Sequence, residues 1–163
     1  MVEKRAAQTL GWVEQAAIDL LSIALDHLTL ARATLFAALL DPAGLERPAL
    51  DRAARAFTAA VDGFHAAGTT HHMPRALLPR ALLHTLLNAP AAARADLDEA
   101  WAIASRGGMR LLMADCHLHR ARLLRDPTAL AQARALIEAC GYGRRRAELA
   151  DAEQAARTWL PAS

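Results

Sequence analysis

Apolar residues recur at helical spacing between residues 109 and 143. In the first half of this stretch they lie 0, 3, 7, 10 and 13 positions from Leu111, which places them on one side of an α-helix. Asp126-Pro127 interrupts the pattern, because proline suits the first turn of a new helix behind an aspartate N-cap. A second apolar stripe starts at Leu130, and Gly141 is a typical residue at the end of a helix. The stretch therefore predicts a hairpin of two helices.

The same order of small and large residues recurs at intervals of 40 residues. A two-helix hairpin cannot bury both of its apolar stripes alone, so this recurrence predicts that hairpins stack on one another. The first helix of the earliest hairpin fits the interval once ten extra residues, Asp41 to Leu50, are assigned to its loop. The recurring positions are Ala121, Ala133, Ile137 and Cys140, then Ala81, Ala93, Leu97 and Ala100, and finally Ala53, Phe57 and Ala60.

The whole chain, residues 1–163, is predicted to form a single helical domain. Residues 3–15 would be the second helix of an incomplete hairpin, so the chain is expected to begin partway through a repeat. A capping helix is expected to close the stack, with the natural C-terminus just beyond it. The predicted hairpins cover about residues 18–66, 71–105 and 109–140, and the capping helix covers 144–159.

These recurring residues resemble those of the tetratricopeptide repeat family. In that family's unit, positions 8, 20 and 27 are small and position 24 is large, which matches Ala121, Ala133, Cys140 and Ile137. Small residues let paired helices approach closely. The large position 4 holds His27, Leu77 and His117 instead of tryptophan, the proline usual near position 32 is missing, and the 40-residue spacing also suits HEAT-like repeats. The resemblance implies an all-α, right-handed superhelix of about eight helices.

Composition favours helix throughout, because alanine and leucine dominate a chain that is 54% hydrophobic but only 4% aromatic. The net charge of +2 points to no nucleic-acid partner, and the short basic run Arg144–Arg146 is interpreted as a solvated surface. Two cysteines are too few for a disulfide framework, which favours a cytoplasmic location. The N-terminus lacks a signal pattern, and no long apolar stretch is free of charge, so no membrane span is predicted.

No metal site, cofactor or enzymatic activity is predicted. His117 and His119 lie two positions apart on a predicted helix, so their side chains diverge and cannot readily share one ion. The interpretation favoured instead is that His27 and His117 fill a groove between helices, while His71 and His72 lie at a helix start. Cys116 and His117 are adjacent on the predicted helix, so their side chains also point in different directions. The sequence contains no phosphate-binding glycine loop and no nucleophile motif.

The expected function is binding of a protein or peptide by the concave face of the stack. In tetratricopeptide arrays, positions 2, 5, 9 and 12 of each repeat face that groove, and leucines beside arginines suit an amphipathic or acidic peptide. The family's carboxylate-clamp pattern of lysines and asparagines is absent. The resemblance assigns Leu25, Leu28, Arg32 and Leu35 to the groove from the first hairpin, Arg75, Leu78, Leu82 and Thr85 from the second, and Asp115, Leu118, Arg122 and Arg125 from the third.

Other functions stay open. The spacing and the Ala-Arg-Leu composition look like the C-terminal arrays of large bacterial signalling proteins, where such an array is similar to a sensor or scaffold. The main alternative is therefore self-association, as a homo-oligomer, or docking within a larger protein of that kind. This alternative predicts an exposed apolar patch near residues 1–25. A metal-binding or enzymatic role is the least favoured interpretation.

Overall fold

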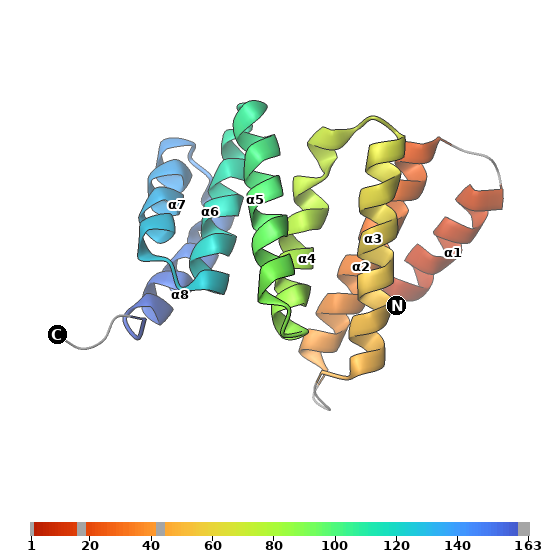
Figure 1. The fold of residues 1–163 in the computed structure, drawn as a ribbon, viewed down its shortest axis with the longest axis horizontal. Coiled ribbons are helices and arrows are strands. Elements are labelled where there is room, and N and C mark those ends of the chain that lie inside the picture. The colour runs from red at the N-terminus through yellow and green to blue at the C-terminus, as the bar shows by residue number, and fades with distance from the viewer. Residues whose placement is uncertain (1, 16–18, 42–44, 160–163) are drawn as a thin grey trace.

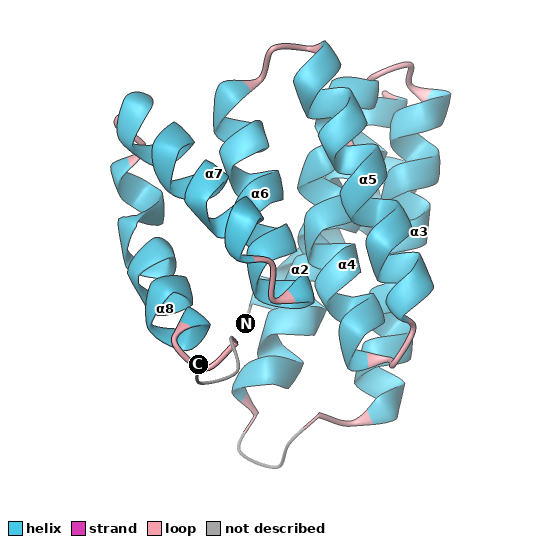
Figure 2. Cartoon of the chain, turned by 60° about the vertical axis from the view of Figure 1, so that its left-hand side comes forward, coloured by secondary structure: helices cyan, strands magenta, loops and turns pink. Residues whose placement is uncertain are grey.

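The structure, a computed structural model, describes residues 2–15, 19–41 and 45–159. Within these ranges all regular structure is helical, with eight α-helices and two 3₁₀ turns (Figures 1 and 2). The α-helices are α1 (Val2–Gln15), α2 (Leu20–Leu40), α3 (Arg47–Ala66), α4 (Pro74–Leu86), α5 (Pro90–Arg106), α6 (Arg110–Leu124), α7 (Pro127–Ala139) and α8 (Arg146–Ala156). The 3₁₀ turns are η1 (Thr70–His72) and η2 (Gly143–Arg145).

The helices pair in the order of the sequence. α2 packs against α3, α4 against α5 and α6 against α7, and each of these hairpins contacts the next (Figure 1). α2, α4 and α6 are therefore called the first helices, and α3, α5 and α7 the second helices. α4 also contacts α2 and α6, and α6 contacts α8, so the first helices lie beside one another. The predicted all-α class and the three helical hairpins are confirmed.

Two predicted boundaries differ from the structure. Residues 47–50, predicted to be loop, form the first turn of α3, because Pro48 lies at a helix start where a missing amide hydrogen costs nothing. Residues 71–73, predicted to be helix, form a 3₁₀ turn and a connection, and α4 begins at Pro74 for the same reason. Pro79 lies inside α4, between Arg75 and Leu82.

A Leu-x-x-Ala pattern recurs in α2, α4, α6 and α8, and it is buried every time. No member of the four pairs is more than 7% exposed. The pattern shows that α8 packs on the hairpin before it with the same residues as the three first helices, although it was predicted only as a capping helix. The pairs are Leu28 and Ala31, Leu78 and Ala81, Leu118 and Ala121, and Leu149 and Ala152.

Each second helix is followed by a glycine in the left-handed region of backbone conformation. Gly68, Gly108 and Gly141 have φ angles of 66°, 60° and 60° after α3, α5 and α7. Side chains with a Cβ atom rarely adopt this conformation, whereas glycine does so without a steric penalty. The three hairpins thus end in the same backbone geometry, which directs the chain into the next helix.

The buried residues form two hydrophobic clusters. The larger cluster comes from α2, α3, α4 and α5, with Met73 and Cys116, and includes the fully buried Phe57 and Phe64. The smaller cluster comes from α6, α7 and α8 and includes Leu118, Ile137 and Leu149. Side chains of α6 such as Leu112 and Met113 pack against the larger cluster and connect the two.

Among the described helices, α2 alone is long and apolar enough, by length and composition, to cross a membrane. In the fold it packs against α1 and α3, and Ala24, Ala31 and Leu35 on it are fully buried. Only 33% of this apolar window is buried inside the fold, and Leu20, Phe36 and Leu40 of α2 are exposed. Burial against α1 and α3 therefore accounts for only part of the apolar character of α2.

Candidate ligand groove

A groove of about 710 Å³ crosses the first helices of all three hairpins. Its lining comes from α2, α4, α6, η2 and the start of α8. Because α2, α4 and α6 lie side by side, residues distant in sequence meet in this groove. Its volume falls within the usual range for ligand pockets, about 300–1,000 Å³.

Apolar side chains line much of the groove. Phe36 on α2 and Leu111 on α6 are large apolar residues that are 42% and 46% exposed within the groove. Leu78 and Leu82 on α4 lie between them, and Leu78 is only 3% exposed. Phe36, Leu111 and the half-buried Leu82 therefore offer an apolar surface that a ligand can cover.

Five arginines line the same groove, against two carboxylates. Arg122 pairs with Asp151 of α8 at 2.9 Å, and Arg145 pairs with Asp115 at 2.7 Å. In the part of the chain that the structure describes, the remaining three form no ion pair and no hydrogen bond through their side chains. These three are Arg32 on α2, Arg75 on α4 and Arg144 in η2.

Asp115 is the centre of a buried polar network that joins α6 to α8. Its carboxylate is only 5% exposed, and it accepts hydrogen bonds from Arg145 Nε at 2.7 Å and from the Tyr142 hydroxyl at 3.3 Å. The same guanidinium donates through Nη1 to Glu148. Arg145 therefore contacts both carboxylates of the groove and offsets one of their two negative charges, and the network fixes η2 and α8 against α6.

His119 lies in the same groove, and its Nδ1 is 2.9 Å from the carbonyl oxygen of Asp115. Burial lowers the pKa of His119, an effect that the Asp115 carbonyl and carboxylate oppose. The ring is therefore neutral near pH 7 and adds no charge to the groove. When neutral, it donates Nδ1–H to the carbonyl oxygen, which leaves Nε2 as the hydrogen-bond acceptor.

The groove contains six of the twelve residues that the resemblance assigns to it: Arg32, Arg75, Leu78, Leu82, Asp115 and Arg122. Leu28, Leu35 and Leu118 are instead buried in the hydrophobic clusters, with exposures of 5%, 0% and 1%. Arg125 is exposed but follows α6 in the left-handed conformation and does not line the groove. Leu25 and Thr85, also assigned to the groove by the resemblance, do not line it either.

Sequence reasoning missed several residues of the groove. Phe36 and Leu111 lie on first helices outside the family positions used, and their apolar character gave no sign that they are exposed. Tyr142, Arg144, Arg145 and Glu148 reach the groove because η2 and α8 fold back over α6. The recurrence of Leu149 and Ala152 is the one sequence signal that could have placed α8 beside the first helices.

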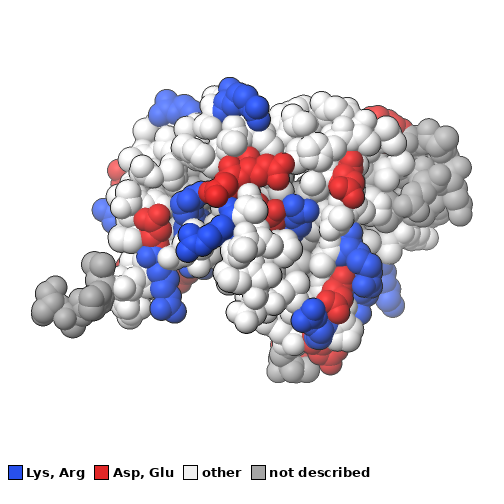
Figure 3. Space-filling model, viewed as in Figure 1, with Lys and Arg blue, Asp and Glu red and all other residues white. Residues whose placement is uncertain are grey.

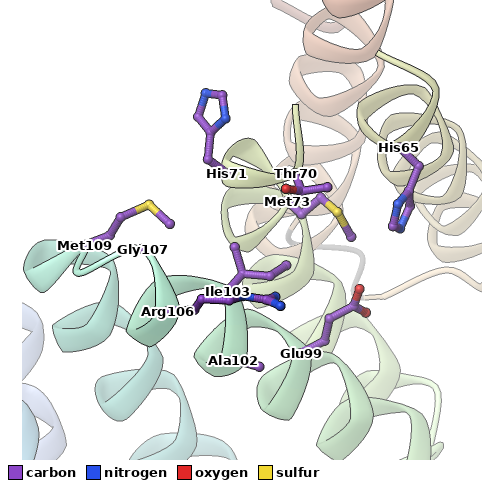
Figure 4. Close-up of a pocket in the computed structure, with 10 residues that line it drawn as sticks. All are labelled: His65, Thr70, His71, Met73, Glu99, Ala102, Ile103, Arg106, Gly107 and Met109. Atoms are coloured by element: carbon purple, nitrogen blue, oxygen red, sulfur yellow. The ribbon is translucent and has the colours of Figure 1, made fainter. Parts of the chain in front are cut away.

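A second, shallower hollow of about 440 Å³ lies between η1 and the end of α5 (Figure 4). It contains His65, His71, Glu99 and Arg106, and Figure 4 shows that His65 and His71 lie on different sides of it. Among the described residues, no group of three histidine, cysteine or acidic side chains could hold a metal ion. His72 stacks on Phe64, and its buried Nδ1 has no hydrogen-bond partner among the residues that the structure describes.

The remaining candidates for chemistry lie elsewhere. Burial raises the pKa of the Cys116 thiol to about 12, so this cysteine stays protonated and unreactive at neutral pH. The ring of His117 contacts that of Trp101 with centroids 4.4 Å apart, and its pKa is lowered by burial. His117 therefore lies between helices, as the sequence interpretation expected.

The apolar patch that self-association would use was expected near residues 1–25. There, Val2 and Leu20 are 65% and 52% exposed. The described side chains next to Val2 on α1 are mostly polar or small, and the side chains of residues 10–18 lie outside the described part of the chain. Self-association therefore stays a prediction.

Charges of both signs are mixed on the face of the molecule seen in Figure 3, with broad uncharged areas between them. No protein-family model, no curated protein and no solved structure matches the chain. Function therefore has to be inferred from the groove itself.

Proposed function

We propose that the chain is a repeat-type interaction module that binds a peptide segment of another protein in the groove across its first helices. The buried Leu-x-x-Ala pattern and the three left-handed glycines support a stack of similar hairpins, as in tetratricopeptide-like arrays. Successive units of such a stack contribute successive strips of one continuous surface. That surface suits a segment of chain better than a compact small molecule.

The observation that carries this proposal is the exposure of Phe36 and Leu111 within the groove. Large apolar side chains left exposed in a hollow mark places where another molecule excludes water. Unpaired arginines beside them supply polar contacts that orient a ligand. Interfaces are enriched in this combination of aromatic, apolar and arginine side chains.

The proposal is tested with random twelve-residue peptides displayed on phage and selected on the immobilised protein. Enriched peptides are then synthesised with a fluorescent label and titrated by anisotropy against the wild type and the double variant Phe36→Asp, Leu111→Asp. We expect binding to weaken at least about tenfold in the variant, because two apolar contacts are replaced by charge.

Leu20→Asp is the matched control, because Leu20 is 52% exposed on α2, lies on nearly the opposite side of the helix from Phe36, and is outside the groove. Its affinity should equal that of the wild type. Circular dichroism and melting temperature establish that each variant is folded. Failure to enrich any peptide, or equal affinity in the groove variant, would refute the proposed function.

A further inference from the structure

We infer that the segment bound in the groove is acidic, and that its carboxylates contact Arg32, Arg75 and Arg144 more than Arg122 or Arg145. This inference rests on the proposed function and specifies the chemistry of the partner. It follows from how the charges inside the groove are already compensated.

Arg145 is unavailable to a ligand because two carboxylates already hold it. Its side chain is 18% exposed, it donates to Asp115 at 2.7 Å, and it also donates to Glu148. Releasing it would leave the nearly buried Asp115 without its cation, which is costly. Both acidic groups that line the groove thus share this one guanidinium, which offsets one of their two negative charges, and the other four arginines leave the groove with a positive surplus.

Arg122 already forms one exposed ion pair. Its guanidinium pairs with Asp151 at 2.9 Å, but both side chains are well exposed, at 45% and 68%. Exposed ion pairs of this kind contribute little to stability, so they are easily replaced by other contacts. Arg122 is therefore expected to contribute less to ligand binding than an arginine with no partner.

Arg32, Arg75 and Arg144 come from three different elements and line one groove without a carboxylate partner among the described residues. Three uncompensated cations around an apolar surface form a positive field that favours anionic ligands. Guanidinium groups also match carboxylates geometrically, because they donate two parallel hydrogen bonds.

The arginines alternate with apolar side chains along the helices. Phe36 lies one turn after Arg32 on α2, and Leu78 lies three residues after Arg75 on α4, so each pair shares a helix face. Three neighbouring helices at about 8–10 Å spacing span roughly 20 Å, the length of about six extended residues. A peptide of that length with leucines among glutamates or aspartates complements this surface.

A nucleic acid is the weaker candidate for the same charges. Single-stranded nucleic acids need aromatic surfaces on which successive bases stack. The groove offers Phe36 and Tyr142 as its aromatic residues other than His119, and they come from α2 and from the turn before α8. Leucines between them favour aliphatic side chains over bases.

The test repeats the phage selection on the wild type and on the triple variant Arg32→Gln, Arg75→Gln, Arg144→Gln. We expect the share of aspartate and glutamate in wild-type-selected peptides to be about twice that of the unselected library, and to return to the library value in the triple variant. The matched control is Arg52→Gln, Arg55→Gln, Arg94→Gln, which removes three exposed arginines of α3 and α5 that lie outside the groove.

A direct titration uses a labelled peptide of four Leu-Glu-Glu units, its Leu-Gln-Gln counterpart and a twelve-residue oligo-dT. The acidic peptide should bind at least about tenfold more tightly than the glutamine peptide at 0.1 M salt, and the difference should shrink at 1 M, where charges are screened. Each single substitution of Arg32, Arg75 or Arg144 should weaken binding more than Arg122→Gln does.

The outcomes separate this inference from the proposed function. Enriched peptides without an acidic excess, or equal binding of the two labelled peptides, would overturn the inference and leave peptide binding intact. Tighter binding of oligo-dT with the same dependence on these arginines would also overturn it. If no peptide is enriched and neither labelled peptide binds, both proposals fail.

Discussion

Two aspartates on α5 show how strongly the role of a charge depends on its burial. Asp96 is 4% exposed and accepts two hydrogen bonds from Arg80 of α4, at 2.7 and 2.9 Å. Asp98 lies two residues further on, pairs with Arg120 of α6 and has a side chain that is 67% exposed. Both pairs connect α5 to a neighbouring helix, but only the first is shielded from water.

Asp96→Asn is expected to lower the free energy of unfolding by about 3 kcal/mol, because Arg80 would keep its charge in a poorly solvated site. Asp98→Asn is expected to lower it by less than about 1 kcal/mol, since water replaces an exposed ion pair. Urea unfolding followed by circular dichroism measures both. Equal losses in the two variants would contradict the assignment of a structural role to the Arg80–Asp96 pair.

At the scale of elements, α2 and α3 approach so closely that one position between them cannot carry a side chain. A Cβ atom added to Gly63 of α3 would lie 2.8 Å from the Cβ atom and 3.3 Å from the Cα atom of Ala24 on α2. Ala24 is fully buried, so it cannot move aside without shifting the helix. Glycine is therefore required here by packing, although it weakens the helix itself.

Gly63→Ala is expected to lower the free energy of unfolding by about 1–2 kcal/mol, because the steric cost exceeds the gain of about 1 kcal/mol in helix propensity. Adding Ala24→Gly should recover part of the loss by removing the opposing methyl group. Gly143→Ala is the control, since a Cβ atom there has no described neighbour within 4 Å. A Gly63→Ala protein as stable as the wild type in urea would refute the close approach.

Much of the element structure could be predicted from the sequence, because proline, glycine and apolar spacing act locally. The recurring small residues identified the three hairpins, and Ala81, Ala121 and Ala133 are indeed fully buried. The face of each first helix that meets water was harder to predict, because leucines are equally apolar in a core and in a groove. Leu118 is buried and Leu111 is exposed, and only the neighbouring helices decide which is which.

The polar network of the groove could not be predicted for a different reason. Asp115 and Arg145 are 30 residues apart, and no local pattern in either segment indicates that they meet. Their contact depends on how η2 turns the chain so that α8 returns to α6. Contacts of this kind follow from the packing of whole hairpins and leave no periodic signal.

On the scale of the whole molecule, the two hydrophobic clusters predict unequal local stability. Ile137 of α7 belongs to the smaller cluster, and Leu97 occupies the corresponding position of α5 in the larger one. Both side chains are at most 2% exposed. In a stack whose units contact only their neighbours, a cavity should destabilise its own cluster first.

Ile137→Ala is expected to lower the free energy of unfolding of the smaller cluster by about 2–4 kcal/mol. Amide hydrogen exchange should then be faster in α6, α7 and α8, with little change in α2 and α3. Leu97→Ala should instead speed exchange in α2 to α5. Hydrogen exchange followed by mass spectrometry of peptic fragments distinguishes these patterns. Uniform acceleration along the chain in both variants would show that the molecule unfolds as one cooperative unit.

The groove lies across the boundary between the two clusters. Arg32 and Arg75 belong to helices of the larger one, whereas Tyr142 and Glu148 belong to segments of the smaller one. An occupant that contacts both sides binds only when the halves keep their native arrangement, so by mass action its presence opposes their separation. Ligand concentration would then set how often the C-terminal half opens independently, which links occupancy to the protein's lifetime against proteases.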